Sequence, residues 1–215
     1  GLGVYADGMV ETDGDVGQLL KKLEDLKIAN DTIVIYTTDN GAEVMTWPDG
    51  GTTPFKGEKA TNWEGGFRVP CVVRWPGVVK AGTVINEVTS LEDWMPTLLA
   101  AAGVPDVKEK LLKGYHAGTK TFKVHLDGYN LLPALKGETK EWPRKEFFYF
   151  SDDGDLLALR YNRYKFVFAE QRAKGRGVWF EPFVILRAPA LFDLRGDPFE
   201  RAPEESDYYA DWAIR

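Results

Sequence analysis

The sequence is poor in cysteine and histidine, and it has no long apolar or basic run. Its single cysteine excludes an internal disulfide and leaves the redox compartment open. No segment approaches the roughly 18 consecutive apolar residues that a membrane-spanning helix needs, so we expect no membrane partner. The net charge is −6 and the lysines and arginines are scattered, which argues against nucleic acid as a partner.

The first residues also lack a signal peptide, which would place an apolar stretch after a basic one. A helical pattern of apolar residues follows almost at once, at Val16, Leu19, Leu20, Leu23 and Leu26. This is typical of a chain entered in mid-protein, and we therefore expect a fragment. The missing leader then says nothing about export.

The amino-terminal half indicates α/β architecture. The helix is expected to end near Lys27, and residues 33–37 form an apolar run without alternation, which predicts a fully buried strand of the parallel type. Residues 69–75 predict a second strand. A short helix is expected next, with Asp93 as its N-cap and Gly103 just beyond its end.

The carboxyl-terminal half reads differently. Residues 108–137 are expected to be connection, with 115–118 in a loop, and a boundary is placed near Thr139. Beyond it, short strands separated by turns predict an antiparallel meander at 147–150, 156–160 and 164–168, with 190–192 as a further strand and 208–212 as a short helix. The predicted fold is therefore α/β: residues 1–139 supply part of a mostly parallel sheet flanked by helices, and 140–215 form a small antiparallel β subdomain.

Asp39, Asn40 and Gly41 follow the first predicted strand directly. The carboxyl ends of strands in open α/β sheets are where ligands gather. A carboxylate and an amide carbonyl suit Ca²⁺ or Mg²⁺, although a calcium site takes about 6 to 8 oxygens, so most ligands would come from elsewhere. The alternative is an ordinary turn, in which Asp and Asn bond their own backbone.

Lys59 lies in a turn bounded by glycines, between Gly57 and Gly65, where a point cation could meet an anionic substrate. It could equally be a solvated loop lysine, with Lys56 as its nearest rival. Glu64 is expected to hold the turn. Arg68 is expected to be a buried partner in an ion pair.

The remaining reactive side chains favour structural roles. Cys71 lies in an apolar run and is expected to be an inert, buried thiol. His116 and His125 have neither the spacing of a zinc pair nor that of a Ser-His-Asp set, so we expect structural or surface histidines, although His125 could reach a cleft.

Several segments together resemble formylglycine-dependent sulfatases of the alkaline-phosphatase-like superfamily, specifically the carboxyl-side half of the catalytic domain. The resemblance covers nearly the whole chain and is carried by residues 13–24, 31–41, 55–70, 90–99, 127–133 and 191–200. It implies that Asp39 and Asn40 are metal ligands and that Lys59, five residues before Glu64, contacts the sulfate. Lys56 does not align with that lysine.

The same resemblance implies a sulfuric ester hydrolase that uses Ca²⁺ or Mg²⁺ on an aryl or carbohydrate sulfate ester. The formylglycine nucleophile and the other metal ligands are expected upstream, outside this chain. Cys71 cannot be the formylglycine precursor, because Val-Val-Arg follows it where the family has x-Pro-x-Arg. We therefore expect the chain alone to be inactive and to need the amino-terminal part of the same protein as its partner.

Two alternatives stay open at this point. A phosphodiesterase or phosphonate hydrolase of the same superfamily would share the metal pair and differ upstream. A non-catalytic module could have kept the scaffold. The frequent export of the family favours a periplasmic or secreted protein.

Overall fold

The computed structural model describes residues 1–46 and 49–214, and the chain separates into two compact units. The first unit comprises Gly1–Pro76 and Phe148–Arg215, and the second comprises Gly77–Phe147. The boundary expected near Thr139 lies inside the second unit, and the division into residues 1–139 and 140–215 stays a prediction. None of the described helices is both long and apolar enough to cross a membrane.

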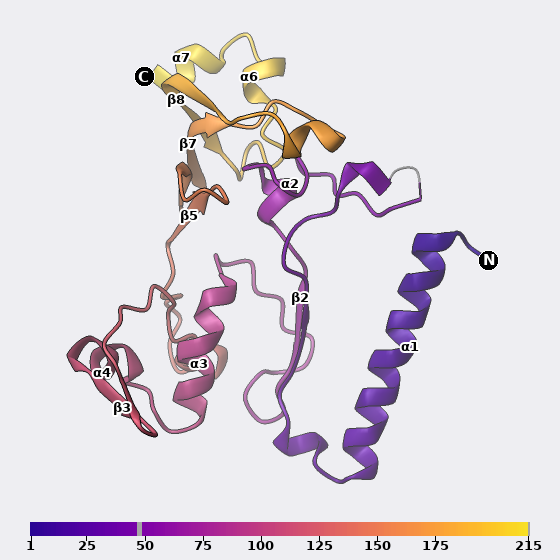
Figure 1. Ribbon diagram of the computed structural model, residues 1–215, viewed down its shortest axis with the longest axis vertical. Coiled ribbons are helices and arrows are strands. Elements are labelled where there is room, and N and C mark those ends of the chain that lie inside the picture. The colour runs from indigo at the N-terminus through magenta and orange to yellow at the C-terminus, as the bar shows by residue number, and fades with distance from the viewer. Residues whose placement is uncertain (47–48, 215) are drawn as a thin grey trace. The chain divides into compact units, whose positions relative to one another are not determined.

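The first unit begins with the helix α1 (Val4–Asp25), which starts earlier than the apolar pattern suggested and buries none of its residues (Figure 1). A 3₁₀ turn, η1 (Ala29–Asp31), leads into β1 (Val34–Thr37). β1 pairs with β2 (Cys71–Arg74), so both predicted strands are present.

The expectation of a fully buried, parallel strand is wrong for β1. β1 and β2 are antiparallel, with Ile35 opposite Val73, and the side chain of Tyr36 is 40% exposed. An apolar run without alternation shows that both faces of a strand are suited to burial, but it carries no information about the direction of the neighbouring strand. A mostly parallel sheet is not seen in the described chain, which remains a mixture of helices and strands.

Two short elements lie in the long connection between β1 and β2. They are the 3₁₀ turn η2 (Val44–Thr46) and the single helical turn α2 (Glu64–Phe67), which follows the lysine-bearing turn. Residues 61–66 are all buried, which is unusual for a connecting segment. This part of the chain is therefore held by other elements of the first unit.

The predicted meander is confirmed as a four-stranded sheet in the order β5 (Glu146–Phe150), β6 (Leu156–Tyr161), β7 (Tyr164–Glu170) and β8 (Val184–Asp193). β7 is antiparallel to both β6 and β8. Leu157, Val167 and Phe192 are at most 1% exposed and form the centre of its core. The strand predicted at 190–192 is longer than expected, because β8 begins at Val184.

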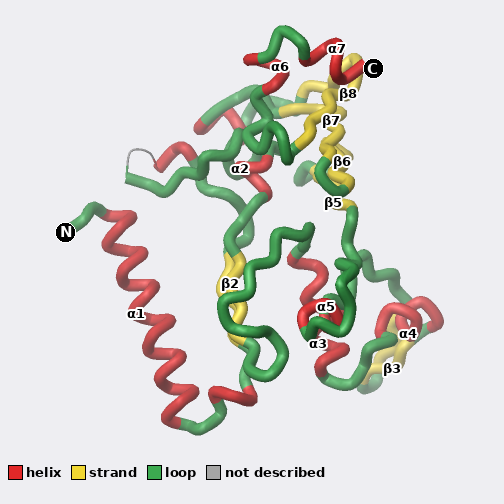
Figure 2. The backbone as a smooth tube through the Cα atoms, turned by 180° about the vertical axis from the view of Figure 1, so that it is seen from behind, coloured by secondary structure: helices red, strands yellow, loops and turns green. Residues whose placement is uncertain are grey.

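Short elements surround this sheet. The 3₁₀ segment η4 (Gly175–Trp179) lies between β7 and β8, and the helices α6 (Ala202–Glu205) and α7 (Tyr209–Ile214) close the chain. Figure 2 shows α7 beside β8. The hydroxyl of Tyr209 accepts a hydrogen bond from the backbone N–H of Leu191 at 2.9 Å, which fixes α7 to the strand.

The second unit contains more regular structure than the sequence indicated. Residues 108–137 include α4 (Val107–Lys113), the hairpin of β3 (Tyr115–Ala117) with β4 (Lys120–Phe122), and α5 (Leu132–Leu135). The expectation of a connection with a loop at 115–118 is therefore wrong. These elements have at most seven residues, too few for a periodic pattern to stand out.

The predicted helix after residue 93 is confirmed, and Asp93 occupies its N-cap position, although its side chain makes no capping hydrogen bond to this helix. A 3₁₀ turn, η3 (Leu91–Asp93), precedes α3 (Trp94–Ala101), and Ser90 forms a capping box with Asp93. Asp93 is fully buried. Its carboxylate also accepts two hydrogen bonds from Nε of Arg144, at 2.8 and 3.1 Å, which compensate for that burial.

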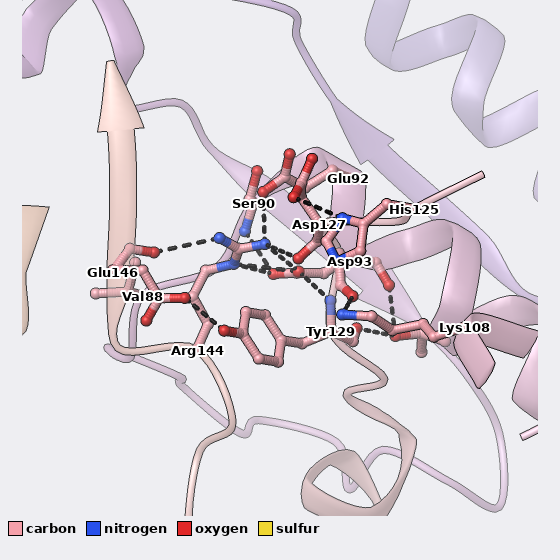
Figure 3. Close-up of polar contacts among 12 residues, drawn as sticks. Val88, Ser90, Glu92, Asp93, Lys108, His125, Asp127, Tyr129, Arg144 and Glu146 are labelled. Atoms are coloured by element: carbon pink, nitrogen blue, oxygen red, sulfur yellow. Dashed lines mark hydrogen bonds and ion pairs between the residues drawn. The ribbon is translucent and has the colours of Figure 1, made fainter. Parts of the chain in front are cut away.

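Figure 3 shows this Arg144 cluster, in which the guanidinium group faces Asp93 and Glu92 and the ring of Tyr129 lies nearby. The backbone N–H of Tyr129 donates to Asp93 at 2.7 Å. Because the 3%-exposed Arg144 is bonded to carboxylates and to backbone carbonyls, its burial is compensated. The cluster ties residues 127–146 to the start of α3.

Candidate active site

The Asp39–Gly41 segment and the Lys59 turn are joined through their backbones. The N–H of Gly41 donates to the carbonyl of Gly66 at 2.9 Å, and the N–H of Lys59 donates to the carbonyl of Ala42 at 3.3 Å. A Cβ atom on Gly41 would lie 1.7 Å from the carbonyl oxygen of Gly65. Only glycine permits this approach, which brings the two sequence motifs together.

Asp39 and Asn40 lie at the exit of β1, as the sequence predicted. Asp39 is exposed, and a hydrogen bond from its own backbone N–H lowers the pKa of its carboxyl below the ordinary value. Partial desolvation, the second effect in size, opposes this shift, but hydrogen bonds from Thr38 and Asn40 and the charge on Lys59 also lower the pKa, and the net pKa is lowered. The carboxyl is therefore held as an anion, beside an amide that can turn its oxygen outward.

This donor set fits a hard divalent cation, but only in part. A carboxylate and an amide oxygen are the ligands that Ca²⁺ and Mg²⁺ prefer. Within the described residues, no group of three or more His, Cys, Asp or Glu side chains could hold a metal. Asp39 and Asn40 would thus complete a site rather than form one, and their assignment as metal ligands stays a prediction.

Lys59 faces the same region. Its side chain is 36% exposed, its Nζ lies 3.7 Å from Oε1 of Glu43, and its charge acts on Asp39. The rival Lys56 is engaged elsewhere, because its Nζ lies 2.7 Å from Glu204 and 4.0 Å from the ring centroid of Trp63. The surroundings of the two lysines therefore differ: Lys59 lies near Asp39, whereas Lys56 pairs with Glu204. The sulfate-contacting role of Lys59 stays a prediction.

Glu58, which the sequence reasoning missed, fixes the turn on its other side. It is 3% exposed, and its two oxygens accept backbone hydrogen bonds from Val44 at 2.8 Å and from Gly175 at 2.7 Å. One carboxylate therefore links η2, the Lys59 turn and η4. No local pattern marks this role, because both donors are backbone groups distant in sequence.

A buried charge cluster lies beneath the turn. Lys165 on β7 places its Nζ 2.7 Å from Oε1 of Glu200, 3.3 Å from Oε1 of Glu64 and 2.8 Å from the carbonyl of Asn62. Oε2 of Glu200 accepts a hydrogen bond from the backbone N–H of Glu64 at 2.7 Å. The three charged side chains are at most 2% exposed, so each depends on the others for compensation.

The two carboxyls of this cluster are shifted in opposite directions. Burial raises the pKa of Glu64, but Lys165, the Tyr149 hydroxyl and Arg160 outweigh it, so the net pKa is lowered. Burial also raises the pKa of Glu200, and there the charge of Glu64 adds to it and Lys165 does not compensate fully. Glu64 therefore carries the firmer negative charge of the pair.

Asn62 and Trp63 complete the attachment of the turn to β7. The Asn62 amide donates to the carbonyl of Ala169 at 2.7 Å and accepts from the N–H of Gln171 at 3.2 Å, and Nε1 of Trp63 donates to the carbonyl of Gln171 at 3.2 Å. Glu64 thus does hold the turn, as predicted, but through the distant sheet. The sequence signal of this attachment to the sheet was a charged residue, Lys165, within the otherwise apolar run of β7.

Two expectations near the site are wrong. Arg68 is exposed rather than buried, and its guanidinium lies 4.4 Å from the ring centroid of Phe55. Cys71 is exposed rather than buried, because it stands at the start of β2, although neighbouring atoms still raise the pKa of its thiol through partial desolvation. A raised thiol pKa disfavours the thiolate, which agrees with an unreactive cysteine.

Both histidines lie in the second unit and are surface groups. Nδ1 of His116 is 2.8 Å from the hydroxyl of Thr121 across the β3–β4 hairpin. Nδ1 of His125 is 3.2 Å from Asp127, and both of these side chains are more than 60% exposed. This agrees with the expectation of structural or surface histidines.

Comparison with known proteins matches the same segments. The family model described as Sulfatase matches residues 1–104. Human steryl-sulfatase is 33% identical over 94% of this chain and 36% of its own length, and human N-acetylgalactosamine-6-sulfatase is 35% identical over 94% and 39%. The crystal structure of the PsFucS1 sulfatase from Pseudoalteromonas sp. superposes with a TM-score of 0.77 and 30% identity, over 97% of this chain and 40% of that one.

The chain belongs to the sulfatase family. This confirms the resemblance drawn from the motifs, and the α/β class with it. The sulfatase chain spans less than two-fifths of the length of each of these two relatives. A phosphonate monoester hydrolase from Silicibacter pomeroyi is 22% identical at a TM-score of 0.51, a likeness that concerns the fold alone.

Proposed function

We propose that the complete protein carrying this chain hydrolyses sulfate esters of aryl or carbohydrate compounds. One observation supports the proposal: backbone hydrogen bonds from Gly41 to Gly66 and from Lys59 to Ala42 join the segment that follows Asp39 to the Lys59 turn, in a chain of the sulfatase family. The relatives named steryl-sulfatase and N-acetylgalactosamine-6-sulfatase support a sulfuric ester as the substrate. The first name indicates a steroid ester and the second an amino-sugar ester.

In this proposal, Asp39 and Asn40 hold one side of a divalent cation, Ca²⁺ or Mg²⁺. The bound cation would polarise a sulfate oxygen as a Lewis acid. Asp39 contributes a negative charge: a carboxyl of ordinary pKa is already ionised at neutral pH, and the hydrogen bonds around Asp39 lower its pKa further. Asn40 contributes a neutral oxygen, and its Nδ2 donates a hydrogen bond to Oδ2 of Asp39, which orients the pair.

Lys59 provides the positive charge on the other side. Its ammonium group would bind a sulfate oxygen and stabilise the negative charge that develops as the ester bond breaks. The hydrogen bonds accepted by the Glu58 carboxylate and the one donated by the backbone N–H of Glu64 fix the backbone of the turn. The backbone at Lys59 therefore does not need to reorganise during the reaction. Formylglycine, the nucleophile of the family, is expected upstream of this chain, and the chain alone is expected to be inactive.

The proposal is tested by replacing Lys59 with alanine in the complete protein. We expect kcat for a sulfate ester to fall by at least about tenfold, because one charge that stabilises the transition state is removed. Lys56→Ala is the matched control: it removes a lysine three residues away that pairs with Glu204, and we expect turnover to stay within about twofold. Equal turnover in Lys59→Ala and the wild type would contradict the role of Lys59.

Metal binding is tested separately by thermal unfolding in a calcium or magnesium titration. A ligand that binds only the folded protein raises its unfolding temperature with concentration. We expect the complete protein to respond, and Asp39→Ala to lose most of the response. An unchanged response in Asp39→Ala would remove this residue from the metal site. The same protein lacking formylglycine should keep the response, since the metal ligands are intact.

The partners follow from this proposal. They are a sulfate-ester small molecule or sulfated carbohydrate and the amino-terminal part of the same protein. A periplasmic or secreted location fits such substrates. Expression of residues 1–215 alone, followed by an assay for sulfate release, tests the expected inactivity: measurable turnover by this chain would show that the nucleophile lies within it.

A further inference from the structure

Trp179, at the end of η4, lies beside the Lys59 turn. The Nζ of Lys59 is 5.7 Å from the centroid of the Trp179 ring, near the outer limit for a cation over an aromatic face. The neighbourhood is fixed by Glu58, the residue before Lys59, whose carboxylate accepts the backbone N–H of Gly175 at 2.7 Å. The start and the end of η4 therefore both lie against this turn.

The segment that carries Trp179 is built to hold its shape. Gln171 is 3% exposed, and its Nε2 donates to the carbonyl of Glu181 at 2.7 Å while its Oε1 accepts from the N–H of Ala173 at 2.9 Å. Val178, next to the tryptophan, is 7% exposed and anchors η4 in the core. These contacts order the backbone on both sides of Trp179.

Two large aromatic side chains nevertheless remain outside that core. Trp179 is 47% exposed and its neighbour Phe180 is 83% exposed. Exposed single aromatics are common, but here an indole on an ordered backbone segment lies next to the lysine proposed to bind sulfate. An ester that places its sulfate at Lys59 must carry its alcohol part away from that point, and the Trp179 face is an apolar surface close by.

We infer that Trp179 forms a subsite for the ring of the leaving group, and that it selects sulfate esters of cyclic alcohols or phenols over open-chain alkyl sulfates. The inference rests on the proposed hydrolase function. A flat aromatic ring, or the C–H face of a sugar ring, can stack on the indole and gain dispersion and quadrupole contacts that an open chain makes poorly. Trp179 would thereby bind the ring while Lys59 binds the sulfate.

The test compares Trp179→Ala with the wild type in the complete protein. Three substrates are used: 4-nitrophenyl sulfate, a monosaccharide O-sulfate and a short open-chain alkyl sulfate. We expect kcat/KM for at least one of the two ring-bearing substrates to fall by about three- to tenfold, mainly through KM, with the alkyl sulfate unaffected. The two ring substrates show whether the subsite prefers an aryl or a sugar ring. Trp179→Phe keeps a ring and should restore most of the loss.

Inhibition by inorganic sulfate provides the second readout. It reports on the Lys59 side of the site without any ring, and its inhibition constant should not change in Trp179→Ala. Trp212→Ala is the matched control, because Trp212 is 45% exposed and belongs to α7, where it lies against Tyr209. It should leave all three substrates and the inhibition constant unchanged.

Several outcomes would overturn the inference. If kcat/KM for both ring-bearing substrates stays within twofold in Trp179→Ala, Trp179 does not bind the ring of the leaving group. If Trp179→Ala lowers kcat/KM for the alkyl sulfate and weakens inhibition by inorganic sulfate by the same factor, Trp179 merely positions Lys59. A wild-type protein with no sulfate-ester hydrolysis would instead defeat the proposed function, and this result is distinguishable because it appears without any substitution.

Discussion

The ammonium group of Lys165 lies 2.7 Å from Oε1 of Glu200, and neither side chain has measurable exposure. Oε1 of Glu64 lies 3.3 Å from the same ammonium group, and Glu64 begins the helical turn α2 that follows the Lys59 turn. A strand of the small antiparallel sheet thus supports a site whose proposed ligands come from residues 39–59. The carboxyl-terminal quarter of the chain is therefore part of the site's construction.

Replacing Lys165 with methionine should destabilise the first unit strongly. The substitution removes the cation that Glu200 and Glu64 share, and among the described residues only Glu64 keeps a second cationic partner, Arg160, at 3.3 Å. Breaking a buried ion pair typically costs about 3–5 kcal/mol. Urea unfolding monitored by tryptophan fluorescence measures the change. Lys21→Met is the control, since Lys21 and Asp25 form an exposed i,i+4 pair worth about 0.3–0.5 kcal/mol. Similar losses in the two variants would show that burial of Lys165 contributes nothing.

The same cluster predicts opposite pH effects for its two carboxyls. The pKa of Glu64 is lowered in the folded chain, so its contribution is present above the unfolded value of about 4.5 and is lost as the pH falls through the folded pKa. The pKa of Glu200 is raised, so its contribution is fully present below about 4.5 and is lost as the pH rises through the folded pKa.

Chemical unfolding between pH 7 and pH 3 tests these signs. The Glu64→Gln protein should lose less stability than the wild type on acidification, because it lacks the Glu64 carboxyl, whose protonation destabilises the folded state. Glu200→Gln should lose more, because it can no longer gain from protonation in the folded state. Parallel stability curves for the two variants would contradict the assigned directions.

The contact between Gly41 and Gly65 predicts a specific glycine requirement. In Gly41→Ala the new Cβ would meet the Gly65 carbonyl oxygen at 1.7 Å, so one backbone segment must move. We expect a stability loss of about 1–3 kcal/mol from overpacking and, in the complete protein, loss of sulfate-ester turnover.

Gly17→Ala provides the comparison for this substitution. Gly17 lies in α1 with no atom within 4 Å of an added Cβ, so alanine should stabilise the helix by about 0.5–1 kcal/mol. Thermal unfolding of both variants separates a steric effect from a general effect of replacing glycine. A Gly41→Ala protein as stable as Gly17→Ala would mean that the two segments do not lie as close as the structure places them.

The elements that carry a local signal were predictable from the sequence. The strands at 34–37 and 71–74 and the antiparallel sheet follow from apolar runs and turn residues, and so does the place of Asp39 just after the first strand. The choice of Lys59 over Lys56 followed from the resemblance to sulfatases. Strand direction was not predictable, because an apolar run reports burial and not the course of its neighbour. The 3- to 7-residue elements between Val107 and Leu135 were too short to show a period.

The supports of the site escaped prediction for a different reason. Glu58 bonds backbone groups of Val44 and Gly175, and Lys165 meets Glu200, so each contact joins residues whose proximity exists only after folding. Side-chain identity at one end of such a contact says little about the other end. Arg68 shows the reverse error, since a basic residue before an apolar strand suggested an ion pair and instead stacks on Phe55.

The bridging carboxylate of Glu58 has an evolutionary consequence. Both of its hydrogen bonds are accepted from main-chain N–H groups, so the exposed side chains of η2 and η4 can be exchanged while both bonds to the lysine turn persist. A descendant of this chain could therefore acquire a new preference among sulfated compounds by substitutions at positions such as Trp179, while the platform that presents Lys59 is inherited intact.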